Sequence, residues 1–196
     1  MNGITINPVV FQIPQEKRNP KLIALMMPFD DDFQPVHEAI KEIAEELKLT
    51  CLRADDIWED STIIQDIFSL IYKAELVICD FSRRNTNVFY EAGIVHTLGR
   101  KLIPIVQDFN DIPSDMRHHR HLIYDLSRPD WLLKFRKELK SKIEFELAHR
   151  KKRSSNSSSI SESDLEKFER EKLSGNQANR VGLTQEERLL IHGGAK

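Results

Sequence analysis

The chain has 196 residues, of which 40% are hydrophobic and 31% are charged, and its formal net charge is −2. This balance is typical of a soluble globular domain with an appendage, and it gives no electrostatic case for nucleic acid or an anionic membrane as the main partner. No stretch approaches the roughly 20 apolar residues of a membrane span, the N-terminus lacks the pattern of a secretory signal, and two scattered cysteines support neither a disulfide framework nor a zinc site. We therefore expect a cytoplasmic protein.

The first part of the chain is typical of an arm followed by alternating strands and helices. Residues 1–20 hold a short apolar patch between two prolines, which suits an edge strand or an arm docked on the domain. Residues 22–26 form a continuous apolar run, the pattern of a strand buried on both faces. The apolar spacing then predicts a helix over 34–48, a strand over 50–54 and a helix capped by Asp60 or Ser61.

The same alternation continues to residue 150. Strands are predicted over 76–79, 102–106 and 121–124, with one helix from about Asn87 to Gly99 and a last helix opened by Pro129. Strands that alternate with helices predict a parallel sheet with right-handed crossovers. We therefore predict an α/β fold, a flavodoxin-like or Rossmann-like three-layer sandwich with a five-stranded parallel sheet in the order 2-1-3-4-5. Its ligand crevice is expected at the carboxyl ends of strands one and three.

After Arg150 the composition changes. Residues 151–163 are basic and then serine-rich, which predicts a flexible linker. The segments 163–173 and 184–191 have few apolar residues, and we expect them to be helical only if a partner or second subunit receives them. The predicted organisation is an N-terminal arm over 1–20, a domain over 21–150, and a Ser-rich linker with a charged, partly helical tail over 151–196.

One carboxylate, Glu91, stands where the predicted helix should be apolar. On a helical wheel with Val88 at zero, Glu91 falls at roughly 300°, between Leu98 at about 280° and Val95 at about 340°. An ionised carboxylate there costs several kcal/mol unless it is paired or opens to a cavity. The positive end of the helix and the predicted crevice both reduce that cost.

Two interpretations of Glu91 are open: a capping or salt-bridging residue, or a functional group. A capping box places its Glu three residues after the cap. Glu91 lies four residues after Asn87 and five after Thr86, so its spacing does not fit. The wheel position favours function.

Charged residues at the same predicted edge of the sheet also have two interpretations each. Asp80, at the end of an apolar strand, either faces the crevice or caps the next loop. Arg53 either holds a phosphate or pairs with an aspartate such as Asp55.

Neutral residues at this edge also have two interpretations each. Asn85 and Asn87 either orient a ligand hydroxyl or cap the helix, and Phe29 and Phe33 either stack on a base or pack in the core.

Other motifs give little. The group of His118, His119 and His121 suggests a metal, but no cysteine or tight acidic ligand set completes it, so an exposed histidine cluster is favoured. The sequence has no GxGxxG, GxxxxGK or GxSxG motif, and dinucleotide, P-loop and serine-hydrolase interpretations have no support.

Several of these segments resemble the nucleoside 2-deoxyribosyltransferase-like superfamily. They are Met27-Pro28-Phe29 with its acidic loop, Arg53 to Ile57, and above all Cys79-Asp80-Phe81 followed by Asn85 to Gly93. The last segment is similar to that family's strand-end acid, polar loop and Tyr-Glu-Leu-Gly helix. It also resembles TIR-like domains that cleave NAD. The resemblance covers about residues 20–145.

The resemblance implies roles for individual residues. Glu91 matches the nucleophile that attacks the anomeric carbon, Asp80 matches an acid that binds a sugar hydroxyl or orients Glu91, and Asn87 and Tyr90 fall where the family contacts substrate. It implies no metal or organic cofactor, and a homo-oligomer, because relatives often build the pocket across a subunit interface. Ala92 departs from the family's leucine. The acidic first loop differs from the glycine- and serine-rich phosphate cradle of nucleotide-cleaving relatives.

The resulting hypothesis is a transferase or hydrolase that acts on the N-glycosidic bond of a nucleoside or nucleotide, NAD included. The alternative is a non-catalytic nucleotide-binding or sensing module in a signalling or defence assembly, with the tail as its appendage. A third interpretation is an assembly domain with an unused crevice.

Overall fold

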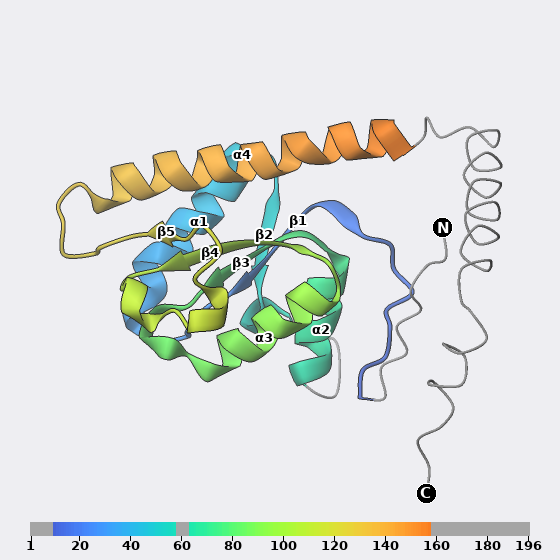
Figure 1. Cartoon of the computed structure of the whole chain (residues 1–196), viewed down its shortest axis with the longest axis horizontal. Helices are drawn as coiled ribbons and strands as arrows, with labels where there is room; N and C mark the ends of the chain where they lie inside the picture. Colours follow the sequence, from blue (N-terminus) through green and yellow to red (C-terminus); the bar gives the residue numbers. More distant parts are fainter. Residues whose placement is uncertain (1–9, 58–62, 158–196) are drawn as a thin grey trace, which may run out of the picture. The chain divides into compact units, whose positions relative to one another are not determined.

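A computed structural model of the chain describes residues 10–57 and 63–157 (Figure 1). Its strands are β1 (Asn19–Met26), β2 (Thr50–Arg53), β3 (Ala74–Asp80), β4 (Lys101–Val106) and β5 (Leu122–Ile123). Its α-helices are α1 (Gln34–Glu46), α2 (Ile63–Lys73), α3 (Thr86–Thr97) and α4 (Trp131–Ser157). No helix in the described ranges is long and apolar enough to cross a membrane.

The five strands form one parallel sheet in the order β2-β1-β3-β4-β5, which confirms the predicted fold. In the centre, β1 pairs with β3, with Ala24 opposite Val77. Every residue of β3 is buried. The apolar runs of the sequence therefore correspond to strands covered on both faces, as parallel sheets require.

Helices cover both faces of the sheet. On one face, side chains from α2 and α3 pack with alternate residues of β1 and β3, among them Ala24, Met26, Val77 and Cys79. On the other face lie α1 and the first part of α4, which are joined by ion pairs of Arg136 with two glutamates of α1. This three-layer arrangement leaves the carboxyl ends of the strands at one edge (Figure 1).

The described part of the N-terminal segment is an arm docked on α2, rather than an edge strand before residue 19. The ring of Phe11 stacks on Phe68 at 4.6 Å between centroids. The backbone of Gln12 exchanges two hydrogen bonds of 2.9 Å with the side chain of Gln65. Of the two interpretations of this segment, docking is the one the contacts support.

The elements differ from the predicted ones mainly at their ends. The last strand has only two residues, and α4 continues through Ser157, past Arg150, where the sequence predicted a linker. Lysine and arginine are good helix formers, so a basic segment that follows a helix can extend it. The predicted caps Asp60 and Ser61 and the predicted helices over 163–173 and 184–191 lie outside the described residues.

Candidate active site

The loops that follow β1, β2 and β3 meet at the carboxyl edge of the sheet. The chain leaves β1 toward β2 and leaves β3 toward β4, so β1 and β3 flank the point where the strand order reverses. Open α/β sheets bind ligands at this point. The first of these loops contains Asp30–Phe33 and the third contains Phe81–Asn85.

Glu91 lies in the second turn of α3, on the side of the helix that faces the sheet. It is 8% exposed, and the other buried residues of this helix are Val88, Ala92 and Val95. The wheel position therefore predicted its burial correctly. Burial alone raises the pKa of the Glu91 carboxyl from 4.5 to about 7, because water stabilises the ionised form less well there.

The cap of α3 comes from another residue. The side-chain oxygen of Asn85 accepts hydrogen bonds from the backbone N–H groups of Asn87, at 3.0 Å, and Val88, at 3.3 Å. Among the residues that the structure describes, none donates a hydrogen bond or an ion pair to Glu91. The capping and salt-bridging interpretations of Glu91 thus find no partner, whereas Asn85 has the capping role that the sequence left open.

Asp80, the last residue of β3, is fully buried and its carboxylate is held by the protein. Its Oδ1 accepts hydrogen bonds from the backbone N–H of Ser82 at 3.0 Å and from Ser82 Oγ at 2.6 Å, and its Oδ2 accepts one from the Tyr124 hydroxyl at 2.5 Å. Burial raises the pKa of Asp80 to about 6 although these hydrogen bonds lower it. Both oxygens are therefore occupied within the protein.

Asp80 and Glu91 lie on opposite sides of the strand end. Successive strand residues point to opposite faces. Cys79 and Phe81 belong to the apolar cluster of α2 and α3, so Asp80 between them points to the other face, where Tyr124 lies. Burial, the Glu91 charge and the Asp80 charge together raise the pKa of the Cys79 thiol well above its ordinary value. Val88 and Ala92, which lie beside Glu91 on the buried face of α3, belong to the same apolar cluster as Cys79.

Arg53 and Asp55 form a forked ion pair at the end of β2. Arg53 Nε donates to Asp55 Oδ1 at 2.6 Å, and its Nη2 donates to Asp55 Oδ2. The guanidinium group also lies over the exposed ring of Phe29, 5.0 Å from the centroid. The structure thus brings these three predicted residues together and shows Arg53 already paired with an aspartate.

The remaining predicted residues are not brought together. Phe33 is fully buried in the core, with Arg83 over its ring at 4.9 Å. Asn87 is exposed. Tyr90 is 55% exposed and lines a separate cavity of about 470 Å³ with residues that include Phe11.

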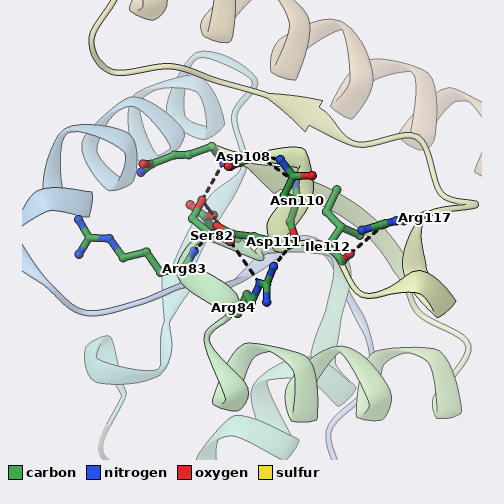
Figure 2. A network of polar contacts seen from close by, with 10 residues as sticks. Ser82, Arg83, Arg84, Asp108, Asn110, Asp111, Ile112 and Arg117 are labelled. Atoms are coloured by element: carbon green, nitrogen blue, oxygen red, sulfur yellow. Dashed lines mark hydrogen bonds and ion pairs between the residues drawn. The ribbon is translucent and has the colours of Figure 1, made fainter.

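The turn between β3 and α3 contains a feature that the sequence did not predict. Arg83 and Arg84 are consecutive non-glycine residues with positive φ, 59° and 52°, a conformation that costs about 1–2 kcal/mol per residue. The loop after β4 holds this turn: Asp111 accepts a hydrogen bond of 2.7 Å from the Arg83 backbone N–H, and the Asn110 carbonyl accepts one of 2.9 Å from Arg84 Nη2 (Figure 2). Strained turns held this way are frequent at functional sites.

The Asp80 partners were also missed. Ser82 Oγ accepts a hydrogen bond of 2.9 Å from the backbone N–H of Gln107, and the Gln107 side-chain amide donates to the Tyr124 hydroxyl at 3.2 Å. The available signal was position, since Gln107 follows one expected strand and Tyr124 ends another, at the same edge as Asp80.

The described residues contain no group of three or more His, Cys, Asp and Glu side chains that could hold a metal ion. The histidine cluster consists of stacked and tilted rings, with His118 and His119 at 4.1 Å between centroids and His96 at 5.2 Å from His119. Of the three histidines that the sequence singled out, His118 is exposed, and His119 and His121 are half-buried.

No family model matches the sequence, and no curated protein matches it. Solved structures similar to this chain include a 2-desoxiribosyltransferase from Leishmania mexicana, which is 19% identical to it. The aligned region covers 45% of this chain and 66% of the enzyme, with a TM-score of 0.40. The solved structures similar to this chain thus include a deoxyribosyltransferase and a TIR domain, the two kinds of protein that the sequence resembles. The chain spans slightly less than two thirds of that enzyme's length.

Two further solved structures cover a larger share of this chain. One is the TIR domain of a Toll-related receptor from Hydra magnipapillata, which is 16% identical to this chain. The aligned region covers 62% of this chain and 97% of the TIR domain, with a TM-score of 0.49. The other is a CMP N-glycosidase from Clostridium botulinum, which is 14% identical to this chain. The aligned region covers 64% of this chain and 98% of the N-glycosidase, with a TM-score of 0.46.

Proposed function

We propose that this protein cleaves or transfers the N-glycosidic bond of a nucleoside or nucleotide, with Glu91 as the nucleophile. The observation that supports this proposal most directly is a buried carboxylate with no hydrogen-bond donor among the described residues, on the face of α3 that packs in one cluster with Cys79 near the carboxyl end of β3. Such a group costs stability, which proteins accept where function requires it. A deoxyribosyltransferase and a CMP N-glycosidase among the similar structures act in this class, although the proposal rests on Glu91.

In the first step, a Glu91 carboxylate oxygen attacks the anomeric carbon of the sugar. The bond from this carbon to the base nitrogen breaks, and its electron pair leaves with the base, which takes up a proton. The glycosyl ester on Glu91 is then attacked by water or by a second base, which regenerates the carboxylate. Two displacements at the same carbon retain its configuration, as in other two-step glycosyl transfers.

The environment of Glu91 suits this role. With a pKa of about 7, a substantial fraction of the group is ionised at neutral pH, as a nucleophile must be. Because no described residue donates a hydrogen bond to it, the carboxylate has none of these bonds to give up when it attacks. Base release should therefore rise with pH through about 7.

We assign Asp80 a positioning role. The resemblance left two roles for it, binding a sugar hydroxyl or orienting Glu91. Because its oxygens accept hydrogen bonds from Ser82 and Tyr124, the contacts favour the second. Asp80 fixes the start of the turn that leads to the Asn85 cap and so to α3.

The test is a substrate screen with matched variants. Purified protein is incubated with deoxynucleosides, ribonucleosides, their monophosphates and NAD, and free base is measured by chromatography. Wild type should release base, Glu91→Gln should release none above background, and Glu91→Asp should retain a small activity because its carboxylate is withdrawn by one methylene. Absence of base release from every compound would refute the proposal, as would equal rates for wild type and Glu91→Gln.

One observation favours a second candidate, the nucleotide-binding module without turnover. Asp80 is fully enclosed and its oxygens are occupied, so it cannot contact a ligand in this arrangement. Calorimetry that detects ligand binding without base release would support this candidate, and measured turnover would exclude it.

A further inference from the structure

The loops at the carboxyl edge of the sheet, where the ligand crevice is expected, are negatively charged. The described parts of the loops after β1, β2 and β3, counted with Arg53, contain five aspartates and three arginines. The aspartates are residues 30, 31, 32, 55 and 56. A ligand that enters at this edge therefore meets more carboxylates than guanidinium groups.

An ion pair crosses the point where the strand order reverses. Arg83, from the loop after β3, donates through Nη2 to Asp32 in the loop after β1, and its Nη1 lies 4.0 Å from Asp30. The guanidinium group is also stacked over Phe33. The loops after β1 and β3 are thus joined by an arginine whose charge is already paired with carboxylates.

The other two arginines of these loops also have carboxylate partners. Arg53 is bound in a fork by Asp55. Arg84 Nε lies 3.6 Å from Asp111, and its Nη2 donates to the carbonyl of Asn110 (Figure 2). Phosphate groups in proteins are commonly bound by Arg side chains that donate two hydrogen bonds. None of these three arginines can donate two hydrogen bonds to a phosphate in this way without first losing its carboxylate partner.

We propose that Asp30 and Asp32 are specificity-determining residues that make the crevice select an unphosphorylated nucleoside over its 5′-monophosphate. This inference rests on the proposed function and names its substrate class. A phosphate dianion could displace Asp32 from Arg83, because an exposed ion pair is weak. The displaced carboxylate and its neighbours Asp30 and Asp31 would still lie close to the phosphate and repel it. The hydroxyl groups of a sugar, in contrast, can donate hydrogen bonds to these carboxylates.

The test compares a double variant with a control of equal charge change. Asp30→Asn/Asp32→Asn removes two carboxylates and releases Arg83. Glu42→Gln/Glu46→Gln removes two exposed carboxylates that pair with Arg136 on α1 and α4, away from the crevice. For each protein, kcat/KM for base release is measured with purine and pyrimidine nucleosides and with their 5′-monophosphates, in about 50 mM and about 500 mM NaCl.

Wild type should prefer the nucleoside by about tenfold or more. The Asp30→Asn/Asp32→Asn variant should reduce that ratio about tenfold, and the control should leave it unchanged. High salt should reduce the wild-type preference for the nucleoside, because it screens exposed charges. A change in the ratio of kcat/KM values that came from a loss of structure would not depend on salt in this way. A wild-type preference for the monophosphate would overturn the inference, and so would an unchanged ratio in the crevice variant.

Binding distinguishes failure of this inference from failure of the proposed function. If no compound is cleaved, calorimetry with the same nucleosides and monophosphates gives the ratio of their dissociation constants. One outcome is that wild type binds the nucleoside more tightly than the monophosphate and that Asp30→Asn/Asp32→Asn loses that preference. This result would support selection of the unphosphorylated nucleoside, although the proposed catalysis would have failed. A protein that binds the monophosphate more tightly, or neither compound, overturns the selection.

Discussion

Replacing Glu91 by Gln should stabilise the protein at alkaline pH. Burial raises the pKa of this carboxyl from 4.5 to about 7 in the folded state, so folding opposes its ionisation. At about 1.4 kcal/mol per pKa unit, this difference corresponds to about 3 kcal/mol when the group is fully ionised. Gln has nearly the same shape and carries no charge, so the variant does not pay this cost.

The sign of the effect depends on pH. Below pH 4.5 the carboxyl is protonated in both the folded and the unfolded state, and the two proteins should be about equally stable. As pH rises from 4.5 through about 7, the unfolded chain loses its proton first, so wild type loses stability and the variant does not. The raised pKa of Asp80 is common to both proteins and cancels in the difference.

Urea unfolding of both proteins at about pH 5, 6, 7 and 8 measures the free energy of unfolding. The difference between Glu91→Gln and wild type should increase with pH and approach about 3 kcal/mol at the highest value. A difference that is independent of pH would refute the assigned burial cost. A wild type more stable than the variant at about pH 8 would indicate a hydrogen bond or ion pair to Glu91.

Three further predictions concern the rest of the fold. Tyr124→Phe should cost about 1–3 kcal/mol in urea unfolding at neutral pH, and less below pH 6, where protonated Asp80 no longer needs this donor; an equal cost at both pH values would contradict this. Phe11→Ala should lower stability by about 1 kcal/mol through the lost ring stack, whereas Val10→Ala, at a 77% exposed position, should change little; equal effects would argue against a docked arm. Lys48→Gly should raise the melting temperature, because Lys48 lies two residues after the end of α1 with φ 59° and the cost of that angle is lower for glycine by about 1 kcal/mol; a lower melting temperature would refute this.

The sheet order was predictable because its signals are local. The run over 22–26 and residues 76–79 of β3 are apolar at every residue, since helices cover both faces. The burial of Glu91 was predictable for the same reason, because helical periodicity places each residue of one helix relative to its neighbours.

The contacts around the site were not predictable, since they join residues far apart in the chain. Tyr124 bonds to Asp80 across 44 residues, and Arg83 to Asp32 across 51. No periodic pattern records which side chains meet at a sheet edge. The left-handed conformation of Arg83 likewise depends on Asp111 in a different loop, because arginine itself does not favour positive φ.

Glu91 should form a covalent bond to the sugar, and peptide mass spectrometry tests this most directly. Wild-type protein is mixed with the nucleoside that it cleaves, quenched in acid at short times and digested. A mass increase equal to one glycosyl group is expected on the peptide that contains Glu91, and none is expected in Glu91→Gln. A glycosyl group on any other residue, or base release by Glu91→Gln at the wild-type rate, would contradict the role of Glu91 as the nucleophile.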